Sequence, residues 1–211
     1  KVKFISDSAF WGCSSFTGNL IIPDSVNSIG QDVFSFCDSF DGNLKISENL
    51  EKISDSLFRF CTQLKGQINL PKKIKSIGEY SFQFCYHLEG QLIIPESVTT
   101  INIGAFEKCN KIEGPLVIPN SVILIKSRAF YGCENLNGDI KLSENIKKIY
   151  DYTFYDCYNL TGSLIIPKSV QIIDKFAFFN CFGFNNDLIL HDSINQIGKY
   201  AFCRCSGFSN D

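Results

Sequence analysis

Apolar residues recur along this chain in a fixed order that repeats every 24 residues. Isoleucine keeps this step from Ile29 to Ile197. Phenylalanine and cysteine keep it at Phe10, Phe34, Phe58, Phe82, Phe106, Phe130, Phe154, Phe178 and Phe202, and at Cys13, Cys37, Cys61, Cys85, Cys109, Cys133, Cys157, Cys181 and Cys205. A fixed period of this length indicates an array of stacked structural units.

Each unit predicts two short strands and one turn. Residues 162–166 alternate in polarity and stop at Pro167, which is typical of a short strand. Residues 170–173 form a second extended piece, and residues 175–181 place apolar side chains at one-turn spacing, which predicts a short helical or 3₁₀ turn. Equivalent main strands are expected at residues 19–22, 43–46, 67–70 and onward.

One such unit cannot bury its own apolar side, but stacked units can, because equivalent positions form ladders about 4.8 Å apart along parallel strands. The fold class predicted is a right-handed solenoid of about nine 24-residue rungs, roughly 45 Å long. We expect residues 1–211 to form a single leucine-rich-repeat domain. The chain starts and stops within a repeat and has no polar capping unit, so we expect a fragment of a longer array.

The repeat text resembles the BspA-like class of leucine-rich repeat. The clearest copies are residues 90–109 (GQLIIPESVTTINIGAFEKC) and 114–133 (GPLVIPNSVILIKSRAFYGC). The repeat proline is replaced at Ser47, Ser143 and His191, and the glycine is replaced by Asn186 in the eighth copy. The resemblance covers the whole chain. It implies a cell-surface or secreted protein of a microbe, used for adhesion to host tissue, extracellular matrix or other cells.

Three interpretations of the cysteine series compete. A disulfide ladder is disfavoured because equivalent Cα–Cβ vectors run parallel, whereas a disulfide needs converging vectors. A metal site needs grouped ligands, and only Cys203-Arg204-Cys205 comes close. The pattern favours a buried column of reduced thiols that act as small apolar residues, with Cys203, outside the series, at least partly exposed.

Composition excludes several function classes. The net charge is −2, and lysines and acids are mixed along the chain, so no field of one sign is available to attract nucleic acid or a membrane surface. No apolar run approaches the roughly 18 to 20 residues of a membrane span, so we expect no membrane insertion of this segment.

The sequence contains no convincing catalytic group. His87 and His191 lie more than four rungs apart, and no phosphate loop, nucleophile elbow or zinc-protease motif is present. Glu89 and Glu113 occupy the same position in successive repeats, which we call a column, and could form a carboxylate pair on adjacent rungs. Two surface acids, however, are usually solvated. We therefore expect no enzyme activity, no catalytic residues, no cofactor and no metal. The segment Asn159-Leu160-Thr161 fits the glycosylation pattern, which supports exposure only weakly.

The leading hypothesis is a protein-interaction module, because the core columns hardly vary while the columns between them vary freely. The partner would be a protein or a surface glycan. The alternative is a structural spacer or a scaffold that self-associates end to end. An enzyme is a distant third.

Two surfaces are candidates for partner binding. On the main-strand face, outward apolar residues are expected beside polar neighbours at Ile93, Val117, Ile165, Ile189, Gln91 and Ser163. The alternative patch is the aromatic column Tyr131, Tyr155 and Phe179 on the turn side. For the first surface, the simpler explanation is that β-branched residues suit a strand. For the second, it is that the rings lie over the edge of the core.

Overall fold

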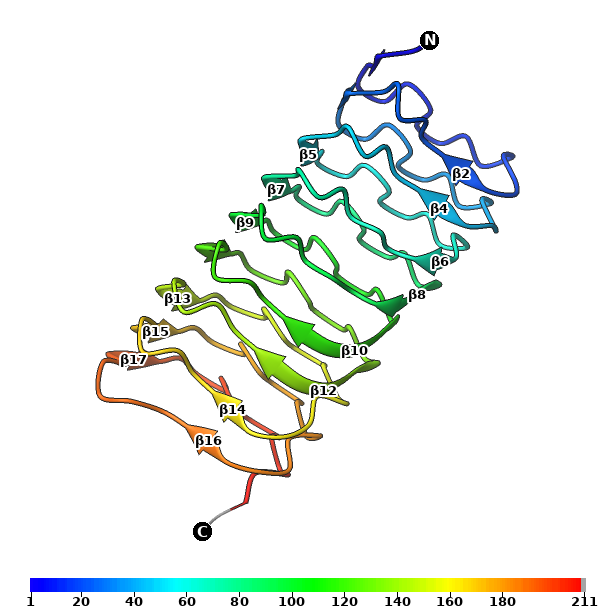
Figure 1. The fold of residues 1–211 in the computed structure, drawn as a ribbon. Helices are drawn as coiled ribbons and strands as arrows, with labels where there is room; N and C mark the ends of the chain where they lie inside the picture. Colours follow the sequence, from blue (N-terminus) through cyan, green and yellow to red (C-terminus); the bar gives the residue numbers. More distant parts are fainter. Residues whose placement is uncertain (210–211) are drawn as a thin grey trace.

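The computed structural model describes residues 1–209 of the chain, and these residues form a coil of short parallel strands (Figure 1). One ladder of strands, here called the main ladder, comprises β2 (Leu20–Ile21), β4 (Leu44–Lys45), β6 (Gly66–Gln67), β8 (Leu88–Gln91), β10 (Lys111–Val117), β12 (Leu136–Lys141), β14 (Leu164–Ile165) and β16 (Leu188–Ile189). The second ladder comprises β1 (Phe4–Ile5), β3 (Ser28–Ile29), β5 (Lys52–Ile53), β7 (Ser76–Ile77), β9 (Thr100–Ile101), β11 (Leu124–Ile125), β13 (Lys148–Ile149), β15 (Ile172–Ile173) and β17 (Gln196–Ile197).

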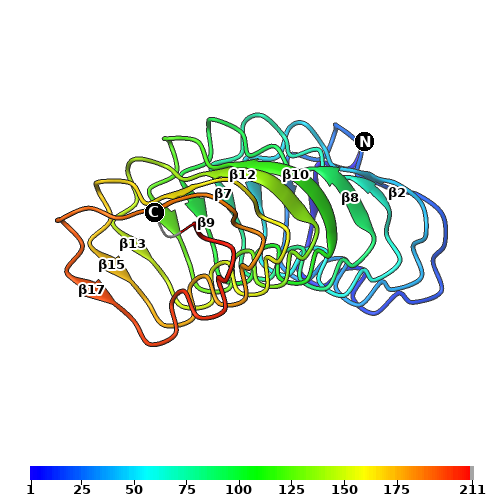
Figure 2. The ribbon, with the colours of Figure 1, turned by 90° about the horizontal axis from the view of Figure 1, so that it is seen from below.

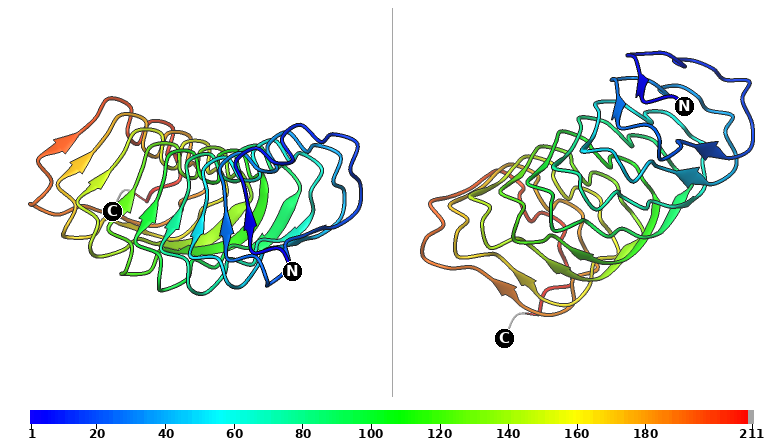
Figure 3. Two further views of the ribbon diagram at one scale, coloured as in Figure 1. Left: turned by 90° about the horizontal axis from the view of Figure 1, so that it is seen from above. Right: turned by 45° about the horizontal axis from the view of Figure 1, so that its top comes forward.

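Every strand pairing described is parallel, as expected for a coil that passes each side once per rung. A third side, made of turns, joins the second ladder to the next main strand. The three sides repeat along an axis, and the whole array is bowed, as Figures 2 and 3 show from opposite sides. The predicted solenoid of parallel strands with a 24-residue period is therefore confirmed.

The main strands differ in extent from the prediction. The strands predicted at residues 19–22 and 43–46 are shorter by one residue at each end, and the third lies at Gly66–Gln67 rather than residues 67–70. Those in the middle of the array, β8, β10 and β12, are the longest.

The helical turn predicted near each Ala-Phe-x-x-Cys segment was wrong, because the described residues contain no helix. Each rung instead holds two residues of positive φ four positions apart, as at Tyr80 (54°) and Phe84 (62°). An α-helix needs negative φ at every residue, so these left-handed residues prevent it. The backbone N–H groups of Phe82 and Phe84 donate to the carbonyls of Ala105 and Glu107 in the next rung. The turn side is thus a hydrogen-bonded ladder between rungs.

The space between the three sides is filled by apolar ladders. The repeat phenylalanines stack ring on ring; Phe106 and Phe130, for example, lie 5.5 Å apart at 12°. The buried leucine, isoleucine, valine and cysteine columns pack around them. The prediction of a buried thiol column is confirmed for the seven cysteines from Cys37 to Cys181, all free and buried. Cys13 and Cys205 are only partly buried, because the first and last described rungs pack against a neighbour on one side only.

Within residues 1–209, no helix combines the length and apolar character that a membrane crossing requires.

Candidate partner-binding surface

The main-strand face presents the apolar side chains that the alternation of polarity predicted. Ile93 is 62% exposed, Val117 48%, Ile165 56% and Ile189 44%. Their neighbours along the chain, such as Leu92 and Ile94, point inward and are buried. Successive side chains of a strand point to opposite sides, so burial of one set forces exposure of the other.

The structure brings some of these residues together and separates others. Ile165 and Ile189 are register partners on β14 and β16 and form one apolar step. Val117 of β10 instead pairs with Lys141 of β12, which separates it from Ile165. The apolar surface is therefore discontinuous along the ladder.

Two hollows lie on this face, each beside an exposed isoleucine. The first, of about 520 Å³, is lined by Asn69, Ile93 and Glu96 together with residues next to them in the chain and Glu48 of the rung before. The second, of about 430 Å³, is lined by Ser163, Ile165 and residues of the preceding rung. Both hollows are open on the strand face rather than enclosed, so they can receive side chains of a partner.

The two polar candidates, Gln91 and Ser163, take part in contacts along the ladder. The Gln91 side-chain amide donates to the Pro115 carbonyl at 3.4 Å, and the Ser163 hydroxyl accepts from the Asp187 backbone N–H at 3.3 Å. Gln91 is exposed and Ser163 is half-buried at the edge of the second hollow. Both remain available to a partner on their outer side.

The alternative aromatic patch lies on the turn side, where its rings are half-buried and stacked on one another. Tyr131 and Tyr155 lie 4.8 Å apart at 2°, and Tyr155 and Phe179 lie 4.9 Å apart at 11°. Burial raises the pKa of both tyrosines. Their ring faces are occupied by each other and by the Arg128 guanidinium, 5.4 Å from the Tyr131 centroid. Only edges remain for a partner, so this patch is the poorer candidate.

Sequence reasoning missed a polar network next to that patch. The Arg59 guanidinium donates to the Gln83 side-chain carbonyl at 2.7 Å, and the Gln83 amide donates to the Glu107 carboxylate at 2.9 Å. The Arg128 guanidinium completes the row, 3.5 Å from Glu107. The Glu107 side chain is only 6% exposed. Arg59, Gln83 and Glu107 occupy the same position in successive repeats, 24 residues apart, and this row of polar residues was the signal available in the sequence. Arg128 comes from a different position of the repeat.

The proposed carboxylate pair of Glu89 and Glu113 does not face across the ladder. The register partner of Glu89 is Lys111, and that of Glu113 is Gln91. The register of the β10–β12 pairing shifts directly after Gly114, a glycine with positive φ (79°). Such a bulge adds residues on one strand, so equal positions in the repeat are not opposite each other there.

Both histidines bond to backbone carbonyls of the preceding rung. The His87 Nδ1 lies 2.7 Å from the Thr62 carbonyl, and the His191 Nε2 lies 2.6 Å from the Pro167 carbonyl. The His191 Nδ1 also lies 2.6 Å from the Ser193 hydroxyl, which donates to the Lys168 carbonyl at 2.9 Å. These contacts hold the rungs together. His191 stands where other repeats have a proline, and its side chain bonds to the carbonyl of Pro167, the proline of the preceding repeat.

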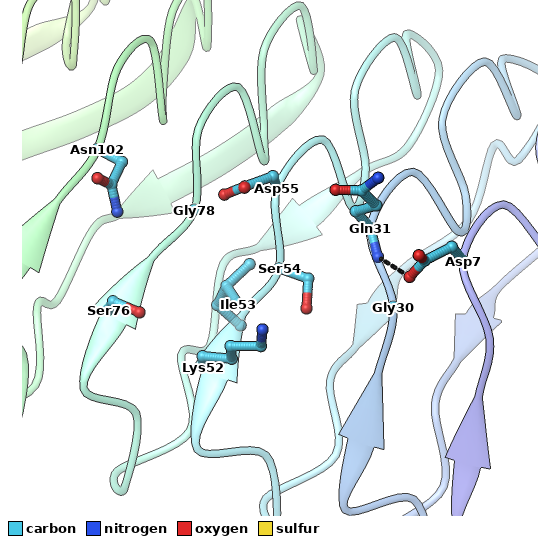
Figure 4. Close-up of a pocket in the computed structure, with 10 residues that line it drawn as sticks. All are labelled: Asp7, Gly30, Gln31, Lys52, Ile53, Ser54, Asp55, Ser76, Gly78 and Asn102. Carbon is cyan, nitrogen blue, oxygen red and sulfur yellow. Dashed lines mark hydrogen bonds between the residues drawn. The ribbon is translucent and has the colours of Figure 1, made fainter.

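A polar hollow of about 400 Å³ lies on the second-ladder side (Figure 4). Its carboxylates are engaged by the backbone: Asp7 accepts from the Gln31 N–H at 2.9 Å, and Asp55 accepts from the Glu79 N–H at 2.8 Å. These hydrogen bonds join each rung to the next. Across residues 1–209, no three His, Cys, Asp or Glu side chains gather closely enough to hold a metal ion.

Comparison with protein families matches residues 3–137 and 114–210 to the BspA type leucine-rich repeat region, in six copies. The chain belongs to the BspA-type leucine-rich-repeat family. No curated protein matches it.

Solved structures of bacterial leucine-rich-repeat proteins share the fold of this family member. That of Bacteroides ovatus is 21% identical with a TM-score of 0.61, over 99% of this chain and 69% of that one. That of T. pallidum is 25% identical with a TM-score of 0.54, over 87% of this chain and 72% of that one. That of Eubacterium ventriosum is 18% identical with a TM-score of 0.58, over 92% of this chain and 59% of that one.

Proposed function

We propose that this chain is a non-catalytic protein-interaction module of a cell-surface or secreted protein and that it serves adhesion. The observation that carries the proposal is the main-strand face, where variable, exposed side chains stand on an invariant buried ladder. Repeat arrays use such faces to bind partners. The association of the family with microbial cell surfaces supports the adhesive role.

The partner is a macromolecule, because the face is open and extended along the ladder. Ile93, Val117 and the pair Ile165 and Ile189 provide apolar contact, and Gln91 and Ser163 provide hydrogen-bonding groups at the rim. Exposed apolar side chains rimmed by polar groups are typical of protein-binding surfaces.

The test measures binding of the fluorescently labelled chain to cultured epithelial cells and to immobilised matrix proteins. Replacing Ile93 and Val117 together by serine should weaken binding by about 1 kcal/mol or more, roughly fivefold, as for interface residues that matter. The matched control is Ile123→Ser, because Ile123 is 60% exposed but lies at the second ladder. Normal binding by the double variant, with loss of binding on changing Tyr131 and Tyr155, would move the site to the turn side.

Absence of binding to every cell and matrix surface would favour the alternative, a structural spacer or end-to-end scaffold. Sedimentation of the same preparation then decides between the two alternatives, because a scaffold forms oligomers as concentration rises and a spacer stays monomeric.

A further inference from the structure

The two strand-bearing sides of the coil carry opposite net charge. On the main-strand side, the exposed columns before, along and just after the strands hold ten carboxylates and six lysines, a net charge of −4. The carboxylates are Asp24, Asp41, Glu48, Glu89, Glu96, Glu113, Asp139, Glu144, Asp187 and Asp192, and the lysines are Lys45, Lys65, Lys72, Lys111, Lys141 and Lys168. The whole chain has a net charge of only −2.

The second-ladder side has the reverse balance. Its outward columns hold eight lysines and six carboxylates, a net charge of +2. Four of these charged groups are paired with each other, in the bridges Lys126–Glu79 and Lys148–Asp174. The chain is nearly neutral as a whole, but its two strand-bearing sides carry net charges of opposite sign.

The acidic face combines its charge with apolar hollows. The first hollow contains Ile93 with the carboxylates of Glu48 and Glu96, and the second contains Ile165 with that of Glu144. Among the described residues, neither Glu96 nor Glu144 has a salt-bridge partner. One lysine also lines each hollow, Lys72 in the first and Lys141 in the second, but each hollow holds two carboxylates, because Asp139 joins Glu144 in the second. Each hollow therefore offers an apolar wall within a lining of net charge −1.

The two hollows form a spaced pair on one face. Ile93 and Ile165 occupy the same column three rungs apart, a separation of roughly 14 Å at about 4.8 Å per rung. An extended peptide rises about 3.3 Å per residue, so about four residues separate the two hollows, and a peptide of about ten residues covers both and extends beyond each.

We propose that the main-strand face binds an extended basic segment of a partner protein, with aliphatic side chains seated beside Ile93 and Ile165 and lysine or arginine side chains on Glu96 and Glu144. The proposal rests on the protein-interaction function and specifies its partner. Charge complementarity selects a basic segment over an acidic one and over a neutral glycan. The hollows select aliphatic side chains over a purely charged chain.

The probe is a fluorescent peptide of about ten residues that alternates leucine and lysine, with Leu-Glu and Ser-Lys peptides as controls. Fluorescence anisotropy with the full chain should show binding of the Leu-Lys peptide only, weakening as salt rises because exposed charges are screened. Ile93→Ser with Ile165→Ser should weaken binding about tenfold. Ile123→Ser should leave it within about twofold.

A second pair of variants tests the charge component. Glu96→Gln with Glu144→Gln should weaken binding severalfold and flatten its salt dependence. The matched control is Asp38→Asn with Glu51→Gln, since both acids are exposed and lie off the main-strand face. These four are surface residues, so circular dichroism should show the fold unchanged in every variant.

Equal binding of the Leu-Glu peptide, or equal loss with the two control variants, would overturn the proposal. So would a salt-sensitive dimer that Glu96→Gln with Glu144→Gln abolishes while no peptide binds, because a second copy would then occupy the face. A third outcome is cell binding that depends on Ile93 and Val117 but changes neither with salt nor on adding the peptide as competitor. It would overturn the proposal of a basic partner segment and leave the proposed adhesion function in place.

Discussion

The repeat cysteine is placed to satisfy a backbone carbonyl inside the core. The thiol of each cysteine from Cys37 onward donates to the carbonyl of the repeat phenylalanine 27 residues before it, as Cys109 does to Phe82 at 3.1 Å. Every other member of the series makes the same bond at 2.9 to 3.2 Å. Alanine could fill most of this volume but could not donate, which explains a thiol at this column.

Thiol accessibility gives a direct test of this ladder. In the native protein, about three thiols should react with Ellman's reagent, because only Cys13, Cys203 and Cys205 are partly exposed. All ten should react in denaturant. Sequence reasoning predicted one reactive group, Cys203, since it could not show the open sides of the first and last rungs. Fast reaction of most thiols in the native state would contradict the buried ladder.

The buried thiols should also make stability depend on alkaline pH. Burial raises the pKa of Cys37 from 9.0 to about 11 and raises that of Cys109 well above 9.0. A raised pKa in the folded state means that this contribution to stability is complete below about pH 9 and is lost as pH rises from there through the folded-state value. Each fully buried thiol therefore lowers the free energy of unfolding by up to about 1.4 kcal/mol per pH unit above pH 9.

Urea unfolding between about pH 7 and pH 10.5 measures this dependence. The transition midpoint should stay level to about pH 9 and then fall steeply. A variant with Cys109→Ala and Cys133→Ala should be less stable at pH 7 but should show a shallower decline, because alanine does not ionise. A decline that begins near pH 7 would exclude the thiols as its cause.

At the scale of the element, the turn side depends on left-handed residues that are mostly not glycine. Fifteen non-glycine residues have positive φ, and all fall in two columns of the repeat. A left-handed conformation costs a non-glycine residue roughly 1 to 2 kcal/mol. The hydrogen bonds between rungs offset this cost, since the N–H groups of these columns donate to the next rung, as from Lys108 to the Tyr131 carbonyl at 2.7 Å.

Asp32 allows the backbone strain to be measured with little interference from side-chain contacts. Its φ is 55° and its side chain is half-buried. Asp32→Gly should be more stable than Asp32→Ala by about 1 kcal/mol, because glycine adopts positive φ without a Cβ clash. The control is Asp38, which is exposed and outside the positive-φ columns; there alanine should be at least as stable as glycine. Equal stability of the two Asp32 variants by chemical denaturation would contradict the left-handed assignment.

At the scale of the whole molecule, the array is built so that each rung contacts only its neighbours. Stability is then close to a sum over rungs and the interfaces between them. Each strand accordingly pairs only with strands of the rung before or after it.

Removing one whole rung should therefore preserve the fold. Deletion of residues 91–114 joins Gly90 to Pro115 and keeps the 24-residue frame. The shortened protein should unfold cooperatively with a urea m-value lower by about a tenth, since the m-value scales with the surface exposed on unfolding. Deletion of residues 91–102 breaks the frame and should yield an unfolded or aggregated product by circular dichroism. Normal folding of that second deletion would contradict the dependence on register.

The sequence by itself determined which residues form the core and which face outward. The columns of Phe106, Cys109 and Ile125 are buried, and Ile93 and Ile165 are exposed, as the alternation and the period require. These features follow from local polarity, because a strand or a stacked unit can bury only one set of its side chains. That Ile93 and Ile165 bind a partner stays a proposal. The charge of the face around them depends on which positions of the repeat the coil places on one side.

The tertiary structure alone decided the turn conformation and the local register. Phe84 and Lys108 carry no sequence signal for positive φ, and apolar spacing of the turn fits a helix equally well. Their conformation is selected by carbonyls 23 residues away in the next rung, which no local pattern contains. The pairing of Glu89 with Lys111 likewise depends on a glycine bulge, whose effect appears only between two strands. Burial is a property of each residue's own polarity, whereas these features arise from contacts between rungs.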